Sequence, residues 1–150
     1  MSVRGIILCA LLFVPMMFGA VMAQELRSLV VRNDVGGDLR ARVRHIEELA
    51  KSGVAVEIRG RYCMSACTMY LGLARICVAP NVKFGFHGPT SSIYGISLSP
   101  QDFEAWSRIM ASYYPEPIKE WFLDKGRNVT VGFYELSGAD LVKLGVARCA

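Results

Sequence analysis

The sequence predicts an α/β fold, in which strands and helices alternate along the chain. Short apolar runs, some of them alternating with polar residues, are typical of strands. They are separated by longer segments in which apolar residues recur every three or four positions, as on one face of a helix. The first three elements form a strand–helix–strand unit, whose crossover is nearly always right-handed. Parallel strands are therefore expected.

The first unit is the most clearly marked. Residues 29–31 are an apolar run typical of a short buried strand. Asp38 is a good N-cap for a helix with a single apolar stripe, and Gly53 ends that helix because glycine accepts a positive φ. Residues 54–59 alternate apolar and polar side chains, which predicts a strand with one buried face.

The same patterns continue to the end of the chain. We expect an apolar helical stretch, a short strand and a further extended segment, then a helix that begins after Ser99, with Pro100 in its first turn. A helix follows 115–117, and a short helix begins at Ser137 and precedes a last extended segment. In chain order these are the helical stretch 65–73, the strand 76–79, the extended segment 82–86, the helix that starts at 99–102, the helix that ends at 125–126, the short helix 137–145 and the last extended segment 146–149.

The N-terminus has the pattern of an export signal. Residues 1–23 hold 18 apolar residues and a single charge, Arg4, and end in Val-Met-Ala, which suits cleavage before Gln24. We expect a signal peptide at 1–23, a periplasmic or secreted chain, and no stable membrane span after cleavage; an uncleaved anchor is the alternative. Residues 24–150 show no repeat or linker and are interpreted as a single domain. Their 16 basic and 13 acidic side chains argue against dedicated nucleic-acid binding.

The segment from Gly60 to Thr68 lies at a predicted turn from a strand into a helix, and Ser65 is inside it. Backbone N–H groups at a helix start stabilise negative charge, which suits a serine that attacks a carbonyl. The N–H of Ala66 would then face the developing oxyanion. The competing interpretation is that Ser65 is only a helix cap.

Two more features point to the same sheet edge. Gly36 and Gly37 also follow a strand and precede a helix, so a parallel sheet would place them near Ser65. Glycine lets the backbone approach a substrate closely and donate a second N–H to an oxyanion. His87 ends another extended segment and is the candidate general base. The other histidine, His45, is expected on the solvated face of the first helix.

These motifs resemble a known family in their order and spacing. They are V-G-G-D at 35–38, C-M-S-A-C at 63–67, R-x-C-V-A-P-N at 75–81, F-G-F-H at 84–87 and L-S-G-A-D-L-V-K-L-G-V-A at 136–147. The chain is similar to the Clp-protease/crotonase superfamily over about residues 27–149, and most of all to its exported Clp-like branch with a C-x-S-A-C serine motif.

The resemblance implies specific roles. Ser65 would be the nucleophile, His87 the base, and Gly37 with Ala66 the oxyanion hole. The family's third catalytic acid would fall near Phe133, where the nearest candidates are Glu135 and Asp124.

The chain also differs from the family at its start. It begins at the family's second βα unit, which implies a minimal β-α-β superhelix that lacks the first βα unit. The exposed sheet edge of such a fold would suit a partner subunit, so a homo-oligomer is one alternative.

Three functions compete at this point. The first is an exported serine hydrolase, a peptidase acting on a peptide or protein substrate. The second is a catalytically degenerate Clp-like module that binds a peptide or partner protein. The third is thiol–disulfide chemistry through Cys63 and Cys67, although C-x-x-x-C is not the usual redox spacing. No cofactor is expected, and neither histidine nor cysteine spacing suggests a metal site.

The four cysteines of residues 24–150 allow three pairings. In a parallel sheet Cys63 lies at the carboxyl edge and Cys77 near the opposite edge, about 17 Å away, whereas a disulfide needs Cα atoms within about 7 Å. We therefore predict a Cys63–Cys67 bridge around Ser65 and a Cys77–Cys149 bridge that tethers the C-terminus. Four reduced thiols are the alternative.

Overall fold

The computed structural model describes residues 28–91, 93 and 95–150. Its strands form one five-stranded sheet in the order β1-β2-β4-β5, with β3 also paired to β2. The first four strands pair in parallel, and β5 runs antiparallel to β4. The α/β prediction is confirmed, with a sheet that is mixed rather than all parallel. The strand bounds are β1 Ser28–Asp34, β2 Ala55–Met64, β3 Ile76–Val78, β4 Lys83–Phe86 and β5 Tyr134–Ser137.

Strand β2 is longer than its sequence pattern predicts and continues to Met64. Gly60, with a φ of +98°, marks an irregularity at which the register with β1 shifts. Asn33 supports this point, since its side-chain oxygen accepts a hydrogen bond from the Arg61 N–H at 2.8 Å. Beyond the bulge the strand resumes because Tyr62 to Met64 pair with β4. A glycine that looks like a strand end is thus a bulge within a strand.

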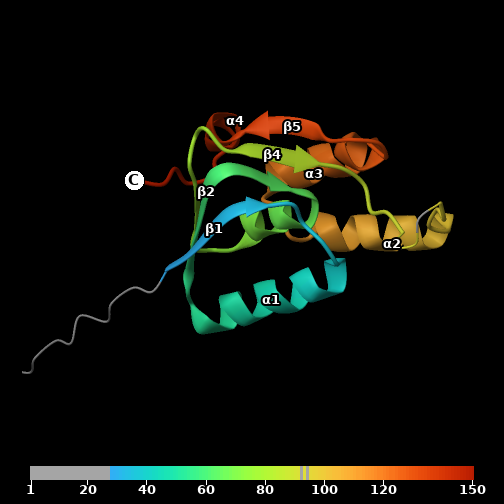
Figure 1. Ribbon diagram of the computed structural model, residues 1–150, viewed down its shortest axis with the longest axis horizontal. Coiled ribbons are helices and arrows are strands. Elements are labelled where there is room, and N and C mark those ends of the chain that lie inside the picture. Colours follow the sequence, from blue (N-terminus) through green and yellow to red (C-terminus); the bar gives the residue numbers. More distant parts are fainter. Residues whose placement is uncertain (1–27, 92, 94) are drawn as a thin grey trace, which may run out of the picture.

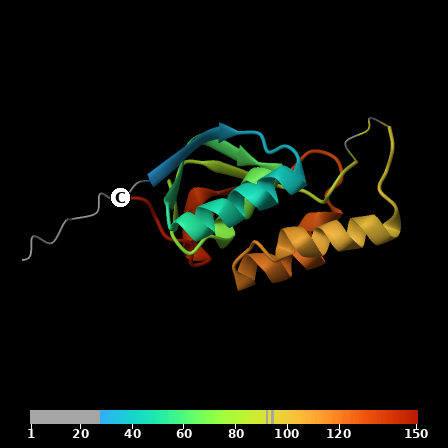
Figure 2. The ribbon, with the colours of Figure 1, turned by 90° about the horizontal axis from the view of Figure 1, so that it is seen from below.

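The helices occupy the predicted places. Asp38 caps α1 by accepting from the Ala41 N–H, Gly53 ends it at a φ of +65°, and Ser99 caps α2. Figure 2 shows α1, α2 and α3 on one side of the sheet, which makes two layers. The helical bounds are α1 Leu39–Ser52, the 3-10 helix η1 Ser65–Gly72, α2 Pro100–Ala111, α3 Glu116–Asp124, the 3-10 turn η2 Gly126–Asn128 and α4 Gly138–Lys143.

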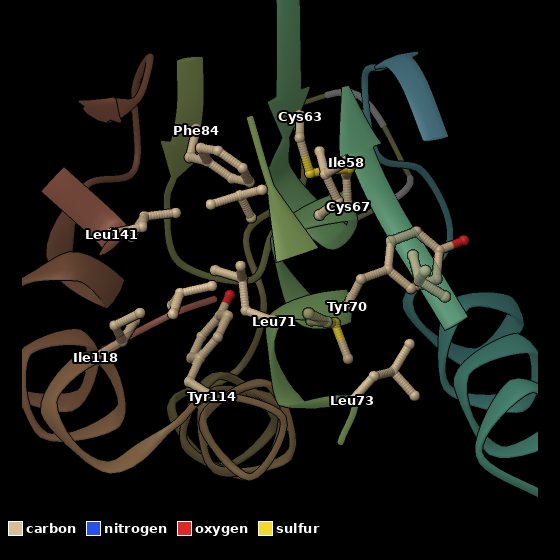
Figure 3. Packing of buried hydrophobic residues seen from close by; sticks show 14 of the residues in the cluster. Ile58, Cys63, Cys67, Tyr70, Leu71, Leu73, Phe84, Tyr114, Ile118 and Leu141 are labelled. Carbon is tan, nitrogen blue, oxygen red and sulfur yellow. A yellow bond between two sulfur atoms is a disulfide. The ribbon is translucent and has the colours of Figure 1, made fainter. Parts of the chain in front are cut away.

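The core gathers around η1. Its residues from Ala66 to Leu71 are all buried, so these six residues present no face to solvent. Figure 3 shows Leu71 pointing toward Tyr114 and Ile118, while Tyr70 points the other way, toward α1. The residue before this buried segment, Ser65, is therefore anchored by packing on several sides.

Other predictions fare differently. Residues 65–73 are helical as expected, but as a 3-10 helix. The strand β5 was not predicted (Figure 1). The extended segment at the C-terminus adds only an isolated bridge between Arg148 and Val78. The predicted signal peptide at 1–23 lies outside the described residues. In the part of the chain that is described, no helix is long and apolar enough to cross a membrane.

Candidate active site

Ser65 stands at the point where β2 turns into η1. Its φ is +55°, in the left-handed region that serine rarely adopts. Such strain costs on the order of 1–3 kcal/mol and persists only where the surroundings enforce it. The surroundings here are the buried residues that follow Ser65 and a disulfide that joins Cys63 to Cys67. The serine hydroxyl is thereby presented on a sharp, fixed turn between strand and helix.

His87 meets Ser65 because their strands are neighbours. Met64 pairs with Gly85 in the parallel β2–β4 ladder, so both strands reach the same edge of the sheet together. His87 Nε2 lies 2.7 Å from Ser65 Oγ, within hydrogen-bonding distance. Gly88 holds the turn beyond, donating its N–H to the Val129 carbonyl at 2.9 Å. The arrangement is that of a nucleophile and a base in contact.

The imidazole of His87 is half-buried, and its environment is apolar on one side. Burial lowers the pKa of His87 below its ordinary value, and the backbone of Gly88 opposes this shift. Phe133 lies edge-on against the ring, with 5.2 Å between centroids. A lowered pKa keeps the imidazole neutral near pH 7, which is the form that can accept a proton.

The structure brings neither candidate acid to His87. Glu135 is exposed, and its carboxylate lies 3.6 Å from the Lys83 ammonium nitrogen. In the β4–β5 ladder Glu135 pairs with Gly85, two positions before His87. Asp124 is exposed at the end of α3. Across the described residues, no carboxylate is hydrogen-bonded or ion-paired to His87. Where the third acid was expected, the side chain that touches the imidazole is that of Phe133.

Gly36 and Gly37, here called the glycine loop, lie directly against the serine turn. Both have a positive φ, +100° and +124°. A Cβ on Gly36 would stand 2.6 Å from Ser65 Cβ and 3.0 Å from the Ala66 nitrogen, so only glycine fits there. A Cβ on Gly37 would meet nothing within 4 Å, and Gly37 lines the pocket in front of Ser65. The predicted oxyanion donors, Gly37 and Ala66, thus flank one serine.

The pocket in front of Ser65 and His87 has a volume of about 410 Å³. Helix α2 and the segment before it form one wall, and the start of α1 forms another. The guanidinium of Arg40 lies 5.0 Å from the centre of the Trp106 ring at this wall. Apolar lining comes from Leu39, Pro89, Leu98, Trp106 and Met110. A cleft of this size and polarity suits a small organic group or a peptide segment.

The disulfides pair as the parallel sheet predicts, Cys63 with Cys67 and Cys77 with Cys149. Cys63 and Cys67 have no exposed surface, so their bridge is closed to external thiols. Glu57, Cys77 and Cys149 come close together, but both sulfurs of that group are in the second bridge and cannot serve as thiolate ligands.

Sequence reasoning missed several contributors. His45 is partly buried and hydrogen-bonded to the Tyr70 hydroxyl at 2.7 Å, and does not lie free in solvent as expected. The position of Phe133 depends on β5, which had no local signal beyond two adjacent aromatic residues. Arg42 looks like one more cation on a charged helix face, yet it binds Asp34 and the glycine loop. No family model matches the chain, and no curated protein matches it either.

Proposed function

We propose that this protein is an exported serine hydrolase, a peptidase in which Ser65 is the nucleophile and His87 the general base. The observation that carries the proposal is the 2.7 Å contact between His87 Nε2 and Ser65 Oγ, on a turn where Ser65 has a positive φ. A serine that only capped a helix would need neither the strained conformation nor the histidine.

The proposed chemistry is acyl transfer. Ser65 Oγ attacks the carbonyl carbon of a peptide while its proton passes to His87 Nε2. The carbonyl oxygen gains negative charge and accepts hydrogen bonds from the N–H groups of Gly37 and Ala66. The carbon–nitrogen bond breaks, and His87 gives its proton to the leaving amine. Water then attacks the ester, with His87 again taking the proton, and Ser65 is restored as the acid leaves.

The wider assignment rests on the sequence. The order of motifs supports a place in the Clp-protease/crotonase superfamily, with its β-α-β superhelix. Export to the periplasm or the medium is supported by the pattern of residues 1–23 and by the two disulfides. Strand β1 pairs on one side only among the described strands, and a second copy of the chain is the proposed cover for its other edge.

A second candidate function is a binding module that kept the cleft and lost catalysis. Phe133 favours it, because a histidine without a carboxylate is a less well-oriented base. Thiol–disulfide chemistry is disfavoured, since the Cys63–Cys67 bridge is fully buried.

The test is labelling of the purified, oxidised protein with a fluorophosphonate, followed by peptide mapping. We expect the label on Ser65, none on Ser65→Ala, and labelling of His87→Ala slower by at least about 100-fold. Ser112→Ala is the matched control, since that serine is exposed at the end of α2 and away from the pocket. An unlabelled native protein that binds peptides in the pocket would instead support the binding module.

A further inference from the structure

The strongest unassigned feature is a polar cluster behind the glycine loop, on the side away from the pocket. It consists of Asp34 at the end of β1, Arg42 and His45 on α1, and Tyr70 on η1. Its members join three elements that converge on the serine turn. Exposed fractions of 11% for the Arg42 side chain and 21% for Asp34 show that this is not a surface ion pair. Such a sheltered network is costly to build unless every group is satisfied.

Two members of the cluster hydrogen-bond to the backbone of Gly36, one to its N–H group and the other to its carbonyl group. The Gly36 N–H donates to Asp34 Oδ1 at 2.7 Å. The Gly36 carbonyl accepts from the Arg42 guanidinium at 3.2 Å, and the same nitrogen donates to Asp34 Oδ2 at 2.7 Å. Asp34, Arg42 and Gly36 thus close a ring of hydrogen bonds. This ring fixes the orientation of the peptide groups that lead into Gly37.

Arg42 is in turn fixed to the helix that follows the nucleophile. Its guanidinium lies over the Tyr70 ring, 4.5 Å from the centre, and a second guanidinium nitrogen donates to the Tyr70 hydroxyl. The hydroxyl proton is then free for His45 Nδ1, 2.7 Å away. Burial raises the pKa of Tyr70, so this hydroxyl keeps its proton. Arg42 therefore ties the glycine loop to η1 through a planar fork, a geometry that lysine cannot reproduce.

We infer that Arg42 is a positioning residue for the oxyanion hole, which sets the Gly37 N–H relative to Ser65 by holding Gly36. The inference rests on the proposed function, because it assigns Arg42 a part in that same reaction. Arg42 does not line the pocket, so it acts on the reaction through the glycine loop and not by touching substrate. An oxyanion donor that is misplaced stabilises the transition state less while leaving substrate binding nearly unchanged.

The test compares Arg42→Lys and Arg42→Gln with Arg44→Lys, a neighbour on the exposed face of α1. With an activated ester substrate, we expect both Arg42 variants to lower kcat by about 10- to 100-fold, with KM within about threefold, since one oxyanion donor is typically worth about 100- to 1000-fold. Arg44→Lys should keep the native values. The amide resonances of Gly36 and Gly37 should shift in the Arg42 variants while those of α3 stay in place.

The outcomes separate the two claims. A native protein that the fluorophosphonate labels at Ser65, together with an Arg42→Lys variant that is folded and keeps native kcat, overturns the role of Arg42 alone. A fall in activity through KM with unmoved glycine amides also overturns it. A native protein that is never labelled overturns the proposed function itself. If Arg42→Gln does not fold, Arg42→Lys and Asp34→Asn, which weakens the same ring from its other side, decide the question.

Discussion

Removing the two disulfides one at a time should show that one bridge mainly stabilises the fold and that the other mainly keeps Ser65 reactive. We consider the double variants Cys63→Ala/Cys67→Ala and Cys77→Ala/Cys149→Ala. The first bridge spans four positions and the second 72. Restricting the unfolded chain is worth about 2 kcal/mol for the short loop and about 4 kcal/mol for the long one. Each variant also loses two sulfur atoms from buried or half-buried positions, so this loss is common to both. The difference in loop length therefore makes the variant without Cys77 and Cys149 the less stable of the two.

Activity should follow the opposite order. The short bridge clamps the residues on either side of Ser65, whose φ of +55° is a strained conformation. Strain of about 1–3 kcal/mol, once released, lowers the population of the competent turn by roughly 5- to 150-fold. The Cys77–Cys149 bridge ties β3 to the C-terminus, and neither of its cysteines lines the pocket. Its loss should leave the labelling rate of Ser65 unchanged.

The assay is urea unfolding for stability and fluorophosphonate labelling for activity, both at a temperature where circular dichroism shows folded protein. The reasoning is refuted if the variant without Cys63 and Cys67 labels at the native rate. It is also refuted if the two variants lose labelling equally, because the clamp would then have no special effect on Ser65.

Three further predictions concern the same site. Burial lowers the pKa of His87, and the neutral imidazole is the base, so kcat/KM should rise with pH. It should reach half its maximum below about pH 6.5, the ordinary histidine pKa. A midpoint above that pH in a pH–rate profile would contradict the assignment of His87 as the base. Phe133→Asp should place a carboxylate beside the imidazole and raise labelling by at least about tenfold, whereas Phe133→Asn, with a similar shape and no charge, should not. Gly36→Ala should abolish labelling because its Cβ would stand 2.6 Å from Ser65 Cβ, while Gly53→Ala, where a Cβ meets nothing within 4 Å, should cost only stability, measured as a lower Tm. Equal labelling of these two glycine variants would count against the close approach.

The parts of the fold that were predicted depend on local signals. Asp38 and Ser99 cap helices through their own side chains, and Gly53 ends a helix through its own φ. The contact between Ser65 and His87 follows from one topological rule, since both residues come directly after parallel strands. These features need no knowledge of distant parts of the chain.

The parts that were missed depend on distant residues. Strand β2 continues past the bulge at Gly60 because Tyr62 to Met64 pair with β4. Strand β5 has four residues, and its place is set by the ladder with β4 rather than by its own pattern. Phe133 reaches His87 only through that ladder, and Arg42 is 28 positions from Tyr70. Side-chain periodicity cannot reveal pairings of this kind.

The direction of the sheet also decides how the molecule is oriented when it is attached to something else. The start of β1 and the C-terminus lie on the same side of the molecule (Figure 1). The ends of β1 and β4 and helix α2 lie on the other side (Figure 1), and residues that follow these two strands line the pocket together with α2. A bead, an affinity tag or a carrier protein joined at either point would therefore leave the serine facing outward. Immobilised protein should be labelled at Ser65 by the fluorophosphonate as readily as free protein is.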